Sequence, residues 1–247
     1  MEETMVKGVI LDFNGTLFFD SQFHDIAWKM ISKEIRGYEM SDEELINHMH
    51  GKNNEMVIKY LKSDIDDETN KKYSLLKEEK YRQMCKAHPD MFHLAPGVIT
   101  FFEYLNKHHI PFTIASASIK ENIDFFIESF ELAKYMDVSK IVYDDGSYPD
   151  KITMFEHAAS LLNTTCDQCL IVEDSVSGIK FARAVNAKYI VAVNSDHNID
   201  KYAQFDYLTR IINDFDEFCY DIISTLYILS LYLQILLGDS FKAILIS

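Results

Sequence analysis

The chain has 247 residues and a formal net charge of -15 at pH 7, with 39 acidic and 24 basic side chains. This length exceeds that of most single domains, so we expect a core domain with a smaller inserted domain. The charge argues against a nucleic-acid partner, since such proteins need clustered Lys and Arg. Four cysteines and the lack of a basic and then apolar amino-terminal segment favour a reduced, cytoplasmic protein.

Short apolar runs recur along the chain and are continuous rather than alternating, which is typical of parallel strands buried on both faces. The runs are 9–11, 112–115, 141–142, 170–172 and 190–193. Between them lie helical patterns, for example Val98, Phe101, Phe102 and Leu105. This alternation predicts an α/β fold with a doubly wound parallel sheet.

Residues 18–92 break the alternation, being rich in Lys, Glu, Asp, Met and Tyr with helical spacing. Ser41 and Glu44 have the spacing of a capping box. We therefore predict a separate helical domain at 18–92, inserted into a core domain formed by 1–17 and 93–221.

Residues 222–247 form an apolar tail, in which 222–238 contain no charged residue. The apolar run is shorter than the ~20 residues of a membrane helix, and it includes Ser, Thr and Gln. We expect a packed helix through which the chain could oligomerise. A membrane anchor, which is less favoured, and an artefact of the sequence are the alternatives.

A carboxylate follows the first apolar run, where Asp12 begins the segment Asp-Phe-Asn-Gly-Thr-Leu. The carboxyl ends of parallel strands are where α/β enzymes keep their chemistry. A carboxylate can attack phosphorus to give an aspartyl-phosphate. In the same turn Gly15 would allow close backbone approach to a phosphate, and Thr16 would supply a hydroxyl.

This segment resembles motif I of the haloacid dehalogenase-like (HAD) hydrolases, Asp-x-Asp-Gly-Thr-Leu/Val, and three further motifs extend the resemblance over residues 6 to 215. The chain departs from the pattern at Asn14, where phosphatases of the superfamily carry a general acid/base aspartate. The insertion at 18–92 is similar to the small helical cap of the β-phosphoglucomutase-like branch. The resemblance thus implies a Rossmann-like HAD core with such a cap.

Ser116, with Ala117 beside it, matches motif II, whose Ser or Thr hydrogen-bonds a phosphoryl oxygen in the family. We expect Ser118 to cap the helix that follows.

Motif III requires a lysine that neutralises Asp12 and the transferring phosphoryl group. Lys151 is our assignment, although its surroundings depart from the usual pattern, and Lys120 and Lys140 are rivals.

Glu173-Asp174-Ser175, followed by Gly178, resembles motif IV. Hard oxygen ligands suit Mg²⁺. The resemblance implies that Asp12 and Asp174 bind Mg²⁺ directly, that the main-chain carbonyl of Asn14 adds a ligand, and that Glu173 acts directly or through water.

In the cap, Lys52 lies where relatives have a substrate-specificity loop and could reach an anionic substrate. His24, near the entrance of the cap, is a second candidate for substrate binding. Each residue also has an interpretation without a functional role: Lys52 as a solvated surface charge, and His24 as a surface or packing histidine. The pair Cys166 and Cys169 has no second CxxC beside it, and we expect Cys169 to begin a buried strand.

Asn14 cannot carry out the general acid/base step, which contributes ~10²–10⁴-fold. We therefore predict a Mg²⁺-dependent phosphatase or phosphotransferase with slow hydrolysis, acting on a small phosphorylated metabolite such as a sugar phosphate. One alternative is a phosphonatase-like carbon–phosphorus hydrolase in which a cap lysine, for example Lys52, forms a Schiff base. The other is a catalytically weakened HAD fold that binds a metabolite or a protein.

Overall fold

The computed structural model describes residues 6–223, and the predicted tail helix lies outside the described residues from 224 on. Six parallel strands form one sheet in the order β3-β2-β1-β4-β5-β6. The strands are β1 (Gly8–Leu11), β2 (Phe112–Ile119), β3 (Val142–Asp144), β4 (Cys169–Glu173), β5 (Tyr189–Val193) and β6 (Arg210–Ile212). The prediction of a doubly wound α/β fold is confirmed.

Helices cover both faces of the sheet. In the central strand β1, Val9 and Leu11 belong to one hydrophobic cluster, and Ile10 belongs to another. The first cluster includes residues of α5 (Val98–Lys107) and α6 (Lys120–Ser129), and the second includes residues of α7 (Lys151–Leu161) and α8 (Val176–Ala184). Because side chains alternate between two buried faces, the strand needs an apolar residue at every position.

The differences from the predicted runs that matter for the site concern β2 and β4, and β6 was not predicted. β2 continues to Ile119, so that Ser116 and Ala117 lie within the strand rather than after it, and its pairing with β3 shifts register between Ser116 and Ile119. Glu173 is the last residue of β4, which begins at Cys169 as expected. The sequence analysis missed β6, because three residues are too few to show a pattern.

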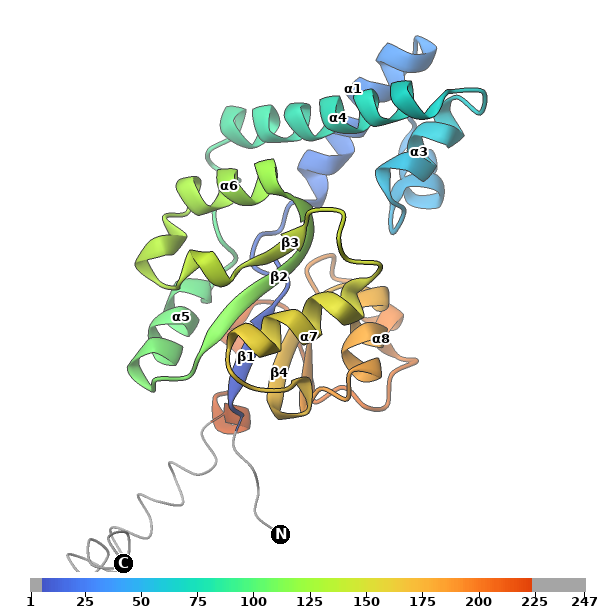
Figure 1. Cartoon of the computed structure of the whole chain (residues 1–247). Coiled ribbons are helices and arrows are strands. Elements are labelled where there is room, and N and C mark those ends of the chain that lie inside the picture. The colour runs from blue at the N-terminus through green and yellow to red at the C-terminus, as the bar shows by residue number, and fades with distance from the viewer. Residues whose placement is uncertain (1–5, 224–247) are drawn as a thin grey trace, which may run out of the picture.

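Between β1 and α5 the chain forms helices. They are α1 (Ser21–Arg36), α2 (Asp42–Glu44), a π-helical turn (Leu45–Met49), α3 (Asn54–Leu61) and α4 (Asp67–Ala87). The predicted capping box of Ser41 and Glu44 is present at α2. Figure 1 shows α1, α3 and α4 together beyond one end of the sheet, with α4 running past α6.

This helical region has its own hydrophobic cluster, which includes Trp28 and Ile31. Its two ends, in contrast, share the main cluster of the core through Phe18, Phe23 and Tyr81. The boundaries of the core and cap domains stay a prediction. Within residues 6–223, no helix is both long enough and apolar enough to cross a membrane.

Candidate active site

The site lies at the carboxyl end of β1, where the order of the strands reverses: β2 and β3 lie on one side of β1, and β4 to β6 lie on the other. Such switch points are where open α/β sheets bind ligands. The Asp12 N–H donates to the carbonyl of Val172 on β4 at 3.0 Å, which fixes the start of the loop against its neighbour. Gly15 has a φ of 74°, and a Cβ there would overlap the Asp174 carboxylate, so this position requires glycine.

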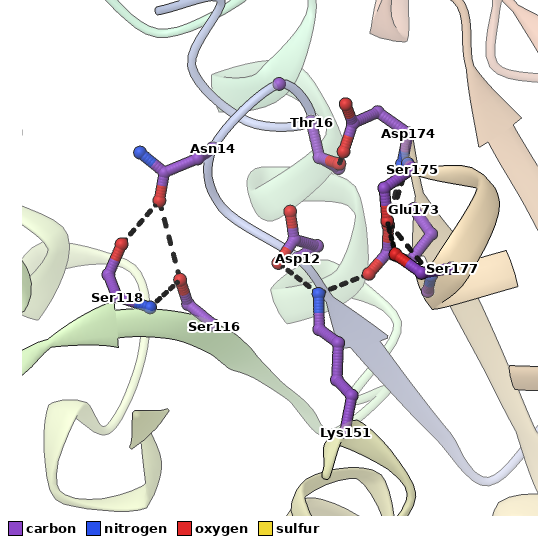
Figure 2. Close-up of polar contacts among 12 residues, drawn as sticks. Asp12, Asn14, Thr16, Ser116, Ser118, Lys151, Glu173, Asp174, Ser175 and Ser177 are labelled. Atoms are coloured by element: carbon purple, nitrogen blue, oxygen red, sulfur yellow. Dashed lines mark hydrogen bonds and ion pairs between the residues drawn. The ribbon is translucent and has the colours of Figure 1, made fainter. Parts of the chain in front are cut away.

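Lys151 stands between two carboxylates. Its Nζ is 2.6 Å from Asp12 Oδ1 and also contacts Glu173 Oε1, as Figure 2 shows. It is the first residue of α7, whose amino terminus is capped by Asp150. The rival Lys120 pairs instead with the exposed Asp124 at 2.5 Å. The structure therefore brings Lys151 to Asp12, as the sequence analysis assigned.

Three buried or half-buried carboxylates gather beside Lys151: oxygen atoms of Asp12, Glu173 and Asp174 lie within 4.8 Å of one another. Glu173 Oε2 also accepts hydrogen bonds from the Asp174 and Ser175 N–H groups, each at 3.0 Å. Burial, together with the charges of Glu173 and Asp12, raises the pKa of Asp174 well above its usual value.

Burial likewise raises the pKa of Asp12, to about 7, against the opposing effect of Lys151. Burial alone would lower the pKa of Lys151, but the charges of Asp12 and Glu173 have the larger effect and raise this pKa above its usual value. One lysine thus faces three carboxylates. This excess of negative charge on hard oxygen ligands fits a divalent cation such as Mg²⁺, which would favour the ionised forms of these groups.

The remaining motif residues flank Asp12. Thr16 is fully buried, and its Oγ1 is 3.5 Å from Asp174 Oδ1. Ser116 is also buried, whereas Ala117 is exposed. Ser116, within β2, and Thr16, in the turn after β1, thus lie at the same end of the sheet (Figure 2).

Asn14 turns toward β2. Its Oδ1 accepts from the Ser118 hydroxyl at 2.6 Å and from the Ser116 hydroxyl at 3.5 Å, and Figure 2 shows both hydroxyls directed at the Asn14 amide oxygen. Its Nδ2 donates to Asp20 Oδ2 at 2.5 Å and to the Tyr81 hydroxyl at 3.3 Å. The expectation that Ser118 caps α6 is wrong: the capping position is Ile119, and no side chain caps the helix there.

Sequence reasoning missed Asp20 and Tyr81. Asp20 could have been found as a charged residue just after an apolar pair, but nothing in the sequence links it to Tyr81, which is 61 positions away.

The two candidates in the cap differ in their contacts. The His24 Nε2 is 3.1 Å from Asp20 Oδ2, and its ring stacks on Tyr81 with centroids 4.2 Å apart. His24 is therefore linked to the motif I loop through Asp20. Lys52 is exposed in the turn before α3, where its N–H donates to the carbonyl of Met49.

A parallel α/β sheet with a lysine-bridged carboxylate cluster at its switch point is the arrangement of an α/β enzyme. The family model described as "Haloacid dehalogenase-like hydrolase" matches residues 9–192, and the chain belongs to this family. The resemblance noted in the sequence is thereby confirmed.

Several relatives agree with this assignment. An HAD hydrolase of family IA, variant 3, from Entamoeba histolytica is 31% identical, with a TM-score of 0.82 over 89% of this chain and 98% of that one. A β-phosphoglucomutase from Clostridium difficile shares the fold, at 17% identity and a TM-score of 0.71 over 92% of this chain and 100% of that one.

A curated relative from Arabidopsis thaliana, a chloroplastic 5-amino-6-(5-phospho-D-ribitylamino)uracil phosphatase, is 24% identical over 84% of this chain. This chain spans 55% of the length of that relative.

Proposed function

We propose that the protein is a Mg²⁺-dependent phosphatase or phosphotransferase that acts on a small phosphorylated metabolite through a phosphorylated Asp12. The observation that carries this proposal is the placement of Lys151 Nζ 2.6 Å from Asp12 Oδ1, beside two further carboxylates. Such an arrangement suits phosphoryl transfer, in which positioning and charge neutralisation are the main catalytic tasks.

In the proposed reaction an oxygen of Asp12 attacks phosphorus, and the bond between phosphorus and the leaving-group oxygen breaks. Lys151 neutralises charge on Asp12 and on the phosphoryl oxygens. Ser116, Thr16 and the N–H groups of the turn at Gly15 donate hydrogen bonds to the phosphoryl group. Water, or a hydroxyl of a second molecule, then accepts the phosphoryl group from Asp12.

Asp12, Asp174 and Glu173 would hold Mg²⁺, with the main-chain carbonyl of Asn14 as a further ligand. When bound, the ion supplies positive charge that stabilises the transition state. Because the Asn14 side chain is not a proton acceptor at neutral pH, water attack on phosphorylated Asp12 lacks a general base at this position. We therefore expect slow hydrolysis of phosphorylated Asp12. The first step also lacks an acid at position 14 that could protonate the leaving group, and it should be least impaired for leaving groups of low pKa.

The metabolite is proposed to be a sugar phosphate or a similar molecule. The Arabidopsis relative, a phosphatase whose named substrate carries a phosphorylated ribityl chain, supports this substrate class. We retain the helical region at 18–92 as the cap that would select the substrate, with His24 and Lys52 as candidate contacts. The free thiols of the described cysteines are in keeping with a reducing compartment such as the cytoplasm.

Contacts in the cap favour ester hydrolysis over the carbon–phosphorus alternative, which needs an uncharged lysine amine beside the substrate. The Nζ of the buried Lys77 is already engaged, at 2.9 Å from Glu78 Oε1 and 2.7 Å from His24 Nδ1. Lys52 is exposed, whereas a Schiff-base lysine is activated by desolvation or by a neighbouring cation. Borohydride trapping with phosphonoacetaldehyde tests this reasoning, and we expect no adduct.

The test of the proposed function is phosphate release from p-nitrophenyl phosphate and from a panel of sugar phosphates, with and without Mg²⁺. We expect turnover that falls by about 10²-fold without Mg²⁺ and is lost in Asp12→Asn. Turnover that persists in Asp12→Asn would contradict the role of Asp12. Binding of panel compounds without any turnover would instead favour the weakened, ligand-binding alternative.

A further inference from the structure

A tyrosine outside the four motifs contacts the main chain of the carboxylate cluster. Tyr202 ends a 3₁₀-helical turn (Ile199–Tyr202) in the segment between β5 and β6, 28 positions after Asp174. Only 1% of Tyr202 is exposed. Its hydroxyl lies 2.8 Å from the carbonyl oxygen of Asp174 and 2.7 Å from that of Val193, the last residue of β5. One hydroxyl proton thus serves two acceptors and joins the end of β5 to the residue that follows β4.

The segment that carries Tyr202 is held by its own contacts. Lys201 Nζ is 2.9 Å from Asp196 Oδ2 and lies 4.8 Å from the centroid of the Tyr202 ring. The Phe205 N–H donates to the Tyr202 carbonyl at 3.0 Å. Tyr202 also belongs to the hydrophobic cluster that includes residues of α7 and α8. A ring that is buried and packed in this way keeps its hydroxyl in one place, against Asp174.

Asp174 is thereby held at both of its main-chain polar groups. Its N–H donates to Glu173 Oε2 at 3.0 Å, and its carbonyl oxygen accepts from the Tyr202 hydroxyl. The next residue, Ser175, caps α8 by accepting from the Gly178 N–H at 3.0 Å, which fixes the chain beyond Asp174. Because an aspartate side chain is short and its rotamers depend on the backbone, the direction of the carboxylate follows the main chain.

The carboxylate of Asp174 has little room to move. A Cβ added at Gly15 would lie 2.3 Å from Asp174 Oδ2, so the carboxylate packs directly against the motif I turn. Oxygen atoms of Asp12, Glu173 and Asp174 lie within 4.8 Å of one another (Figure 2). Since Mg²⁺ demands near-ideal octahedral geometry, a small displacement of Asp174 would weaken the binding of Mg²⁺ by these oxygens.

We propose that Tyr202 is a positioning residue of the metal site, whose hydroxyl holds the main chain at Asp174 so that the Asp174 carboxylate faces Asp12 and Glu173. Outer-shell partners orient metal ligands, and their removal typically lowers metal affinity by about 10–100-fold. The inference rests on the proposed function, because it concerns the proposed Mg²⁺ site. It goes beyond that function in assigning a role to the segment between β5 and β6.

The test compares Tyr202→Phe with the wild type and with Tyr207→Phe. Phenylalanine keeps the ring and removes only the hydroxyl. Tyr207 lies in the same segment, and its ring centroid is 5.1 Å from Arg183 Cζ, so Tyr207→Phe is the matched control.

The probe is Mn²⁺, which shares the preference of Mg²⁺ for oxygen ligands. Electron paramagnetic resonance measures the free Mn²⁺ at a temperature at which all of the proteins are folded. Asp174→Asn identifies the part of the binding that belongs to this site.

We expect Tyr202→Phe to bind Mn²⁺ at this site about tenfold or more weakly than the wild type does, and Tyr207→Phe to bind it as the wild type does. In the presence of p-nitrophenyl phosphate, the Mg²⁺ concentration that gives half-maximal activity should rise in the same proportion in Tyr202→Phe. The kcat of this variant should recover at saturating Mg²⁺.

A role of Tyr202 in stability alone would lower the unfolding midpoint of Tyr202→Phe but leave the Mn²⁺ affinity of the folded protein unchanged. That result would overturn the inference and leave the proposed function intact. If the wild type itself binds no Mn²⁺ through Asp174, the metal site of the proposed function fails, and the inference fails with it.

Where Tyr202→Phe does not fold, the wild-type chain suffices. The hydroxyl proton of Tyr202, observed by NMR, should exchange slowly with water, and its resonance should shift when Mg²⁺ is added. A resonance that stays unchanged while Mg²⁺ binds would overturn the inference without reference to activity.

Discussion

Glu78 provides a prediction about how α4 is held to α6. Its Oε1 is 2.9 Å from Lys77 Nζ and accepts from Asn54 Nδ2 at 2.8 Å, while its Oε2 accepts from Asn122 of α6 at 2.7 Å. Burial alone would raise the pKa of Glu78, but the charges of Lys77 and His24 and these hydrogen bonds lower it to about 2. Glu78→Gln is therefore expected to destabilise the protein.

The magnitude follows from the pKa. A fall from the usual 4.5 to about 2 corresponds to about 3 kcal/mol of unfolding free energy, at about 1.4 kcal/mol for each pH unit. Because the pKa is lower in the folded chain than in the unfolded chain, the contribution is complete above about pH 5 and is lost as the pH falls from 4.5 toward 2.

The assay is urea-induced unfolding of wild type and Glu78→Gln at neutral pH and at about pH 3. We expect a difference of about 3 kcal/mol at neutral pH that shrinks markedly at the lower pH. Lys77→Met/Glu78→Gln is the control: without a buried, unpaired ammonium it should be less destabilised than Glu78→Gln. A difference that does not vary with pH would refute this reasoning about the charge of Glu78.

Three further predictions concern the site and the backbone. Lys151→Ala should lower kcat/KM for p-nitrophenyl phosphate by about 10²–10³-fold, whereas Lys120→Ala, tested in the same assay, should leave it near wild type. Mg²⁺ should raise the thermal unfolding midpoint of the wild type but not that of Asp174→Asn, as measured by calorimetry without substrate. Gly97→Ala should lower the unfolding free energy more than Gly146→Ala does, as measured by urea unfolding of the two variants. Both glycines have a positive φ, but only at Gly97 would a Cβ also overlap the backbone of Phe215 and Asp216.

The convergence of Asp12, Lys151 and Glu173 was predictable from the sequence. Each residue lies at or close to the end of a strand or the start of a helix, and in a parallel sheet these ends meet at one edge. Continuous apolar runs also identified the strands, because the strands of this parallel sheet are buried on both faces. The positions of the motifs relative to the strands thus predicted that Asp12, Lys151 and Glu173 would lie together.

The surroundings of Asn14 were not predictable in the same way. Its contacts with Asp20 and Tyr81 depend on how α1 and α4 pack, and such contacts leave no local pattern. The role of Ser118 was assigned wrongly because a serine near a helix start usually caps it, whereas β2 here continues to Ile119. Sequence patterns report periodicity and strand ends, but not which side chains meet across an insertion.

The most direct test of phosphoryl transfer through Asp12 is a rapid-mixing experiment with p-nitrophenyl phosphate in Mg²⁺, followed by mass spectrometry of the acid-quenched protein. We expect a burst of about one p-nitrophenol per chain and then slow turnover, since Asn14 supplies no base for water attack on phosphorylated Asp12. The quenched protein should carry one phosphoryl group on the peptide that contains Asp12, and Asp12→Asn should show neither signal. Turnover without a burst and without a phosphorylated Asp12 would contradict the account.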